Sequence, residues 1–200
     1  MLIPGFESRM MGLGMSKHLE EDLAIRQGLY EDGTPETASR LKTEAGALIV
    51  VPHTESKTVE WMTSIAPDAI EIYNFHANVD PKIRKAYLDL PAFSDLPGIL
   101  TYLLDPYSKL TPDFGFMNFL VWSPVYFERW NRLIANGTIV TGLAGSDSHE
   151  NFLSDKVADG ERIDSHRRLT RTISNHLLIP ASSGAPDLET LKNSIRAGRG

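Results

Sequence analysis

An aspartate and a histidine, Asp147 and His149, follow an apolar stretch over residues 138–141 whose alternation predicts a strand. One residue separates them, so on an extended backbone their side chains point to the same side. Gly142 and Gly145 lie between the strand and the pair, and we expect them to turn the chain there. A carboxylate and an imidazole that converge at a strand end can bind a divalent metal ion. The pair is therefore a candidate metal site.

Other potential ligands follow further predicted strands. Glu7 comes after a short apolar segment, His53 follows the buried run 47–51, and Asn74 and His76 follow residues 69–73. The carboxyl ends of parallel strands open on one face, so these side chains are expected to meet there. The predicted metal ligands are Glu7, His53, Asp147 and His149, with Asn74 and His76 as weaker candidates for contacts to the ligands or the substrate.

Composition limits the class of protein and of metal. The chain has 200 residues, 42% of them hydrophobic, which suits a single domain over residues 1–200. A formal charge of -6 argues against nucleic acid as the partner. The absence of cysteine leaves His, Asp and Glu as ligands, and these suit Zn, Mn or Fe. The sequence contains neither an apolar run long enough to cross a membrane nor a signal peptide, so we expect a cytoplasmic protein.

Helix and strand patterns alternate in the first half. Thr34 and Gly46 cap a predicted helix over 35–45, which leads into the strand 47–51. A second helix carries Val59, Met62 and Ile65 inward and leads to a strand at 69–74. This alternation predicts parallel pairing and an α/β fold.

The remaining segments are patterned less evenly. Residues 9–32 show little periodicity, and Gly12-x-Gly14 is interpreted as a turn. An irregular helical insertion is predicted at about 80–122, rich in proline and aromatic residues. A helix then begins at Pro124, with Tyr126, Trp130, Leu133 and Ile134 on its inner face. A strand is predicted at 175–179, and a last helix uses Leu188, Leu191 and Ile195 before Gly198.

Four segments resemble, in their order, a PHP-domain metallohydrolase of the polymerase and histidinol phosphatase superfamily. They are residues 4–7, 46–53, 71–74 and 145–149, and the stretch from Trp130 to Asp147 is most similar to CehA/McbA-type members. The resemblance implies a distorted (β/α)7 barrel with two or three divalent metals. In it, Glu7 would bridge metals, His53 would bind one metal, and Asp147 with His149 would complete the set.

The activity that this resemblance implies is hydrolysis by a metal-activated water at the strand ends. The substrate would be a small molecule, a phosphate ester or another ester, and the sequence fixes neither the substrate nor the oligomeric state. No Gly-x-Ser-x-Gly, P-loop or His-Glu-x-x-His motif supports another enzyme class.

The chain also departs from the family pattern. The first family motifs, His-x-His and Thr-Asp-His, are absent, and Arg9 lies near the position of a further histidine. The sequence therefore predicts an incomplete barrel that lacks its first units and is truncated at both ends. The alternative is that the chain has no catalytic function and is a degenerate, partial PHP barrel. An arginine cluster, which is either a solvated basic face or a phosphate contact, comprises Arg162, Arg167, Arg168 and Arg171.

Overall fold

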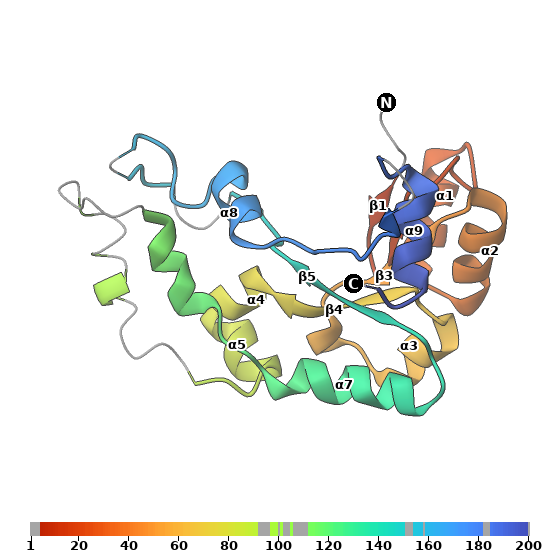
Figure 1. Cartoon of the computed structure of the whole chain (residues 1–200), viewed down its shortest axis with the longest axis horizontal. Coiled ribbons are helices and arrows are strands. Elements are labelled where there is room, and N and C mark those ends of the chain that lie inside the picture. The colour runs from red at the N-terminus through yellow and green to blue at the C-terminus, as the bar shows by residue number, and fades with distance from the viewer. Residues whose placement is uncertain are drawn as a thin grey trace. The chain divides into compact units, whose positions relative to one another are not determined.

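A computed structural model describes residues 5–91, 97–99, 101, 105, 112–150, 154–157, 159–181 and 185–199. The chain is an α/β protein, as predicted, with a five-stranded mixed sheet in the order β1-β2-β3-β4-β5 (Figure 1). The closed barrel stays a prediction. The strands are β1 (Phe6–Glu7), β2 (Met11–Leu13), β3 (Leu48–Val51), β4 (Ala69–Asn74) and β5 (Thr141–Gly145).

The chain divides into two compact units, which are described separately. The first comprises Met1–Ile72, Tyr126–Leu143 and Asn175–Gly200, and the second comprises Tyr73–Val125 and Ala144–Ser174. Each unit has its own cluster of buried hydrophobic side chains. A single PHP-like domain over residues 1–200 stays a prediction.

The strands of the first unit combine both pairing directions. β3 and β4 are parallel, as the alternation predicted, with Val50 beside Ala69. β1 and β2 are antiparallel, with Glu7 beside Met11, because three residues are too few for a crossover connection. The turn predicted at Gly12-x-Gly14 is wrong for Gly12, which lies within β2, where its missing side chain leaves room for the ring of Phe6. Gly14 does lie in a bend after β2, with φ 66°.

Local sequence signals explain most helices of the first unit. The hydroxyl of Thr34 accepts a hydrogen bond from the Thr37 amide at 3.1 Å, and Gly46 ends that helix in the left-handed conformation. The residues predicted to face inward from the next helix, Val59, Met62 and Ile65, are buried. The helices are α1 (Leu23–Asp32), α2 (Pro35–Ala45), the short 3-10 helix η1 (Thr54–Ser56), α3 (Val59–Ile65), α7 (Pro124–Ala135) and α9 (Leu188–Arg196).

Three helices differ from expectation. α1 was not predicted, because it buries only Tyr30 and leaves Leu23 and Ile25 exposed, so it lacks an apolar stripe. α7 buries Tyr126 and Leu133 as predicted, but Ile134 is 49% exposed, which corrects its predicted inner face. In α9 the inner face is likewise mixed, since Lys192 and Ser194 are buried while Leu188, Leu191 and Ile195 are only half-buried.

Asp68, just before β4, connects several elements of the first unit. Its carboxylate accepts a hydrogen bond from the Ile49 amide of β3 at 2.8 Å, and its carbonyl accepts one from the Thr141 amide of β5 at 3.1 Å. The same carboxylate lies 3.6 Å from Lys42 in α2 and 3.7 Å from Arg196 in α9. One residue, through its side chain and its backbone, therefore links the first residues of three strands.

The second unit is mainly helical. The irregular insertion predicted at about 80–122 stays a prediction, and its residues 92–96, 100, 102–104 and 106–111 lie outside the described part. Phe75 packs edge-on against Phe116 and Phe119, with ring centroids 5.6 and 6.0 Å away. Val157, Ile163 and Leu169 complete this core from beyond β5. The elements are α4 (Phe75–Val79), α5 (Pro81–Tyr87), a short helical segment at 97–99, the 3-10 helix η2 (Pro112–Phe119) and α8 (His166–Thr172).

Two strand predictions are corrected. β5 begins at Thr141 and continues through both glycines to Gly145, rather than ending before them. A Cβ at Gly142 would lie 2.6 Å from the Cδ1 of Ile72, so this glycine permits a close approach instead of a turn. Residues 175–179 form no strand, and Leu178 is 75% exposed. The strand was predicted from apolar composition alone, but no strand of the described sheet pairs with this segment.

Gly142→Ala is expected to lower the free energy of unfolding by about 1–3 kcal/mol, because the new methyl group overlaps the Ile72 side chain. Gly28→Ala is the matched control. Gly28 lies inside α1 with nothing within 4 Å of its missing Cβ, so alanine there should add about 0.5–1 kcal/mol. Denaturant unfolding of the two variants measures both effects, and an unchanged midpoint for Gly142→Ala would contradict the close approach.

Tyr73→Phe is expected to change the pH dependence of stability. Burial raises the pKa of Tyr73, whose hydroxyl donates to the Phe119 carbonyl at 2.8 Å. The folded state therefore retains a proton that the unfolded state loses above its pKa of about 10. This contribution is complete below pH 10 and declines as the pH rises further.

The phenylalanine variant should lose about 1 kcal/mol at pH 8 and show a shallower decline above pH 10. Unfolding free energies measured from pH 8 to 11 give both values. Tyr87→Phe removes a half-exposed tyrosine hydroxyl as the control. A decline above pH 10 as steep in Tyr73→Phe as in the parent chain would contradict the assignment.

Candidate metal centre

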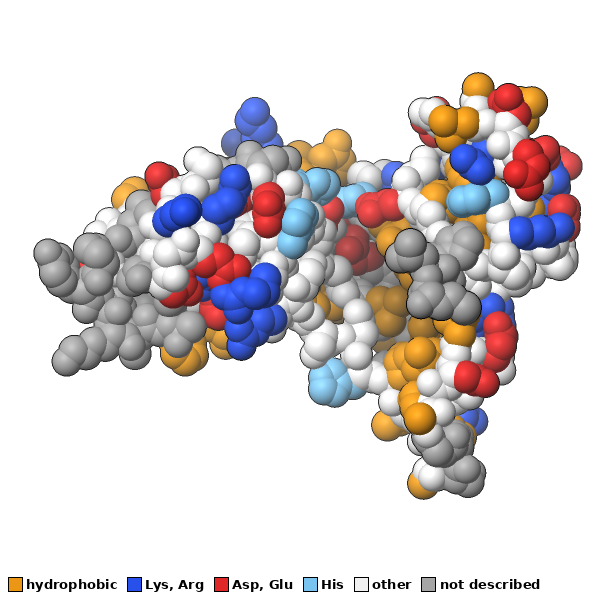
Figure 2. All heavy atoms as spheres, turned by 90° about the horizontal axis from the view of Figure 1, so that it is seen from above, with side chains coloured by type: hydrophobic (Ala, Val, Ile, Leu, Met, Phe, Trp, Pro, Cys, Tyr) orange, Lys and Arg blue, Asp and Glu red, His pale blue; other side chains and the backbone are white. Residues whose placement is uncertain are grey.

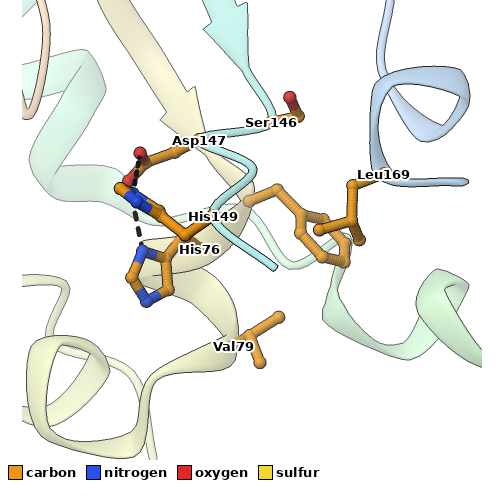
Figure 3. Close-up of a pocket in the computed structure, with 7 residues that line it drawn as sticks. His76, Val79, Ser146, Asp147, His149 and Leu169 are labelled. Atoms are coloured by element: carbon orange, nitrogen blue, oxygen red, sulfur yellow. Dashed lines mark hydrogen bonds and ion pairs between the residues drawn. The ribbon is translucent and has the colours of Figure 1, made fainter. Parts of the chain in front are cut away.

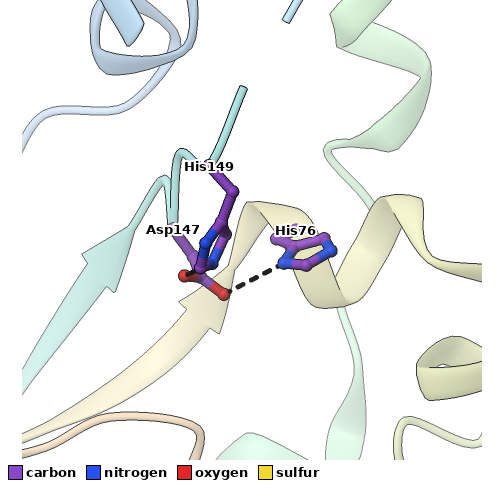
Figure 4. A group of neighbouring side chains, drawn as sticks. All are labelled: His76, Asp147 and His149. Carbon is purple, nitrogen blue, oxygen red and sulfur yellow. Dashed lines mark hydrogen bonds and ion pairs between the residues drawn. The ribbon is translucent and has the colours of Figure 1, made fainter. Parts of the chain in front are cut away.

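The carboxylate of Asp147, two residues beyond β5, is the meeting point of two histidines in the second unit. Its Oδ2 lies 3.3 Å from Nδ1 of His76, and its Oδ1 lies 2.5 Å from Nε2 of His149. The two imidazole rings are 5.1 Å apart between centroids. Figure 4 shows both rings directed at this carboxylate. Three ligating atoms, one from each residue, lie within 4.8 Å of one another.

Asn74 positions two members of this cluster. As the last residue of β4 it caps α4, where its Oδ1 accepts a hydrogen bond from the Ala77 amide at 2.7 Å. That cap places His76 in the first turn of the helix. The Nδ2 group of Asn74 donates to Oδ2 of Asp147 at 3.2 Å. The buried amide therefore orients both the carboxylate and the segment that carries one histidine.

The spacing of these atoms suits a metal ion. Ligands bound to Zn at about 2.0–2.1 Å in a tetrahedron lie about 3.3 Å apart, which is the separation of His76 and Asp147. His149 and Asp147 would need to separate by less than about 1 Å to reach the same geometry.

A hollow of about 10 Å³ adjoins the cluster, with Val79 and Leu169 on its apolar side (Figure 3). This volume holds about one water molecule or ion, and it is too small for an organic substrate.

The backbone at two predicted ligands is strained. Asp147 has φ 47° and His53 has φ 51°, in the left-handed region that glycine and asparagine prefer. Three other described non-glycine residues share such angles: Ala66, Asp89 and Glu150. A histidine or aspartate held in this way costs of order 1–2 kcal/mol, which is typical of positions where the direction of the side chain matters.

A second cluster surrounds His53 in the first unit. Its Nε2 lies 3.5 Å from Oε1 of Glu7, and its Nδ1 lies 3.5 Å from Oε1 of Glu55. The backbone amide of His53 donates to Oε2 of Glu71 at 2.7 Å. His53, Glu55 and Glu71 each offer a ligating atom within 4.8 Å of the others. The parallel pairing of β3 with β4 produces this arrangement, because it brings the end of β3 beside Glu71.

Sequence reasoning assigned no role to Glu55 or Glu71, yet both are buried, at 4% and 8% exposure. The hydroxyl of Tyr126 donates to Oε2 of Glu55 at 3.2 Å. Glu71 lies within a strand whose other residues are mostly apolar, and Glu55 follows a candidate ligand by two residues. A charged residue inside a buried strand was the signal that could have identified Glu71.

The contacts of the four predicted ligands are described within each unit. Glu7 and His53 meet within the first unit, and Asp147 and His149 meet within the second. A common site for all four stays a prediction. Of the weaker candidates, His76 lies as near to Asp147 as two ligands of one metal ion lie to each other. Asn74 donates a hydrogen bond to the same carboxylate.

Three arginines of the predicted cluster in the second unit form ion pairs with carboxylates. The buried guanidinium of Arg168 contacts Asp113 and Asp159, and Arg162 binds Asp164 at 2.8 Å. Arg167 pairs with Glu161. On the face seen in Figure 2, basic side chains likewise lie next to acidic ones. Arg162, Arg167 and Arg168 are therefore paired with acids, whereas Arg171 is exposed.

None of the helices in the described part of the chain is long and apolar enough to cross a bilayer. No protein-family model, no curated protein and no solved structure matches the chain.

Proposed function

We propose that the chain is a metal-dependent hydrolase that acts on phosphate esters or related esters of small molecules. The observation that carries the proposal is the convergence of His76 and His149 on the carboxylate of Asp147 beside an ion-sized hollow. Neutral imidazoles and a carboxylate are the donors that Zn, Mn and Fe share. The resemblance to PHP metallohydrolases supports the same chemistry, and with it a partial (β/α)7 barrel.

The side chains have separate tasks in this proposal. Asp147, His76 and His149 bind one divalent ion, and the Asn74 amide keeps the carboxylate turned toward it. The chemistry supplied with a bound divalent ion is Lewis-acid activation of a water and of the phosphoryl oxygen.

His53, Glu55 and Glu71 bind a second ion in the first unit, with Glu7 as a further ligand on the other side of the imidazole. The Tyr126 hydroxyl holds one oxygen of Glu55, which leaves the other oxygen directed at His53. Two ions agree with the two or three that a PHP-type site implies.

Asp147→Asn is expected to weaken metal binding by at least about 100-fold, since loss of a mere supporting contact already costs about 10–100-fold. The side chain keeps its shape and loses its charge. Titration of the metal-free chain with Co²⁺, followed by visible absorption, gives the affinity and the number of ions. Asp155→Asn makes the same chemical change at an exposed aspartate of the second unit.

Asp155→Asn should bind like the parent chain. Equal Co²⁺ binding by the parent chain and Asp147→Asn would refute the assignment of Asp147 as a ligand. His53→Ala separates the two clusters: it should remove one ion and leave the Asp147 ion in place. Loss of both ions in that variant, or of neither, would contradict independent binding.

Removal of metal is expected to abolish hydrolysis of 4-nitrophenyl phosphate, and Mn²⁺ or Zn²⁺ should restore it. Asp147→Asn should lower the restored rate at least about 100-fold, in line with its loss of metal, while Asp155→Asn should not change it. The release of 4-nitrophenolate measures the rate. Metal binding without metal-dependent hydrolysis of this ester or of a carboxylic ester would instead support the non-catalytic alternative, which the missing His-x-His and Thr-Asp-His motifs favour.

A further inference from the structure

His166, the first residue of α8, is an exposed histidine beside the candidate metal centre of the second unit. Leu169 of the same helix lines the hollow at Asp147 (Figure 3). Residues three apart on a helix are neighbours on one face, so His166 lies on the face of α8 that borders this hollow. It is not one of the three candidate ligands there.

Three contacts connect the loop that carries two of the ligands to the region around the start of α8. The hydroxyl of Ser148, which lies between the two ligands in sequence, is 2.8 Å from Nδ1 of His166. The backbone amide of His166 donates to Oε1 of Glu150 at 2.7 Å, and Nη2 of Arg162 donates to the Glu150 carbonyl at 2.6 Å. The histidine is therefore held through both its ring and its backbone, although it is exposed.

The second ring nitrogen of His166 is available for proton transfer. In the part of the chain that the structure describes, Nε2 has no hydrogen-bond or ion-pair partner. When Nδ1 donates to the serine oxygen, a protonated ring presents its other N–H group at Nε2. Such a ring can act as a general acid, because an imidazole gains and loses a proton near neutral pH.

An ester must approach the metal centre from its exposed side. The hollow of about 10 Å³ admits one water molecule or ion and no organic group, whereas the side chain of His149 is 48% exposed. The open approach therefore passes the loop from Asp147 to Glu150, beside which His166 is held.

We propose that His166 is the general acid of the hydrolysis and gives its Nε2 proton to the leaving oxygen of the ester. This inference rests on the proposed hydrolase function. As the oxygen of water bonds to phosphorus, the bond from phosphorus to the leaving oxygen breaks, and its electron pair stays on that oxygen. The oxygen takes the Nε2 proton and departs as an alcohol. The neutral ring regains a proton from solvent, to which the attacking water releases one.

The test compares two esters whose leaving groups differ in their need for a proton. Phenolate, the anion of a group with a pKa of about 10, leaves poorly, whereas 4-nitrophenolate is a much weaker base and leaves without protonation. In the metal-loaded full chain, His166→Gln is expected to lower kcat/KM about 100-fold for phenyl phosphate and less than about 3-fold for 4-nitrophenyl phosphate. A residue that only supports the structure would lower both rates alike.

Two variants and one binding measurement complete the design. Ser148→Ala keeps the imidazole and removes the contact to its ring, so it should slow phenyl phosphate about 10-fold with little effect on the nitrophenyl ester. His176→Gln makes the same chemical change at an exposed histidine of the first unit and should leave both rates as in the parent chain. Co²⁺ should bind equally to His166→Gln and the parent, because all three candidate ligands are retained.

Equal losses for the two esters in His166→Gln, no loss for either ester, or weaker Co²⁺ binding in this variant would overturn the proposal. Failure of the proposal can be told from failure of the hydrolase. A parent chain that hydrolyses neither ester with Mn²⁺ or Zn²⁺ overturns both. A parent chain that hydrolyses both esters, with a His166→Gln variant that does not discriminate between them, overturns the general acid alone.

Discussion

The arrangement of the first unit depends on the carboxylate and backbone of Asp68. Through these groups the chain links β3, β5, α2 and α9 to the start of β4, within 2.8 to 3.7 Å. The charge of this half-buried acid is compensated by two cationic neighbours and an amide donor. With the strand starts fixed at this residue, the pairing of β3 and β4 determines which residues their carboxyl ends present, and Glu71 meets His53 for this reason.

Two candidate ligands near the strand ends have a strained backbone. His53 and Asp147 each lie two residues after a strand and adopt left-handed angles, and each such residue costs of order 1–2 kcal/mol. Neighbouring hydrogen bonds offset this cost: the His53 amide binds Glu71, and the Asn74 amide binds Asp147. In both cases the group that stabilises the strained residue also belongs to the cluster. The backbone and the candidate ligands are thus held by the same contacts.

Sequence patterns identified elements whose signals are local. The cap at Thr34, the glycine after α2 and the four buried residues of β3 needed no tertiary information. β2 and β5 were misread because their glycines make close contacts with Phe6 and Ile72, which only the folded sheet brings near. The same holds for the candidate site. Asp147 and His149 are two positions apart in sequence and were recognisable, and His76 was predicted as a weaker candidate. Glu55 became evident only from its contact with His53.

Some carboxylates of the chain are paired with arginines and others with histidines, and this difference supports the candidate metal centre. In the second unit Asp159, Asp164 and Glu161 are paired with arginines, which remain protonated and therefore act as permanent counter-charges. The carboxylates of Asp147 and Glu55 are instead faced by histidines. An imidazole can lose its proton and offer a lone pair, which a guanidinium cannot do. A carboxylate beside arginine has its charge neutralised, whereas an imidazole that has lost its proton leaves the carboxylate charge to be compensated by a divalent cation.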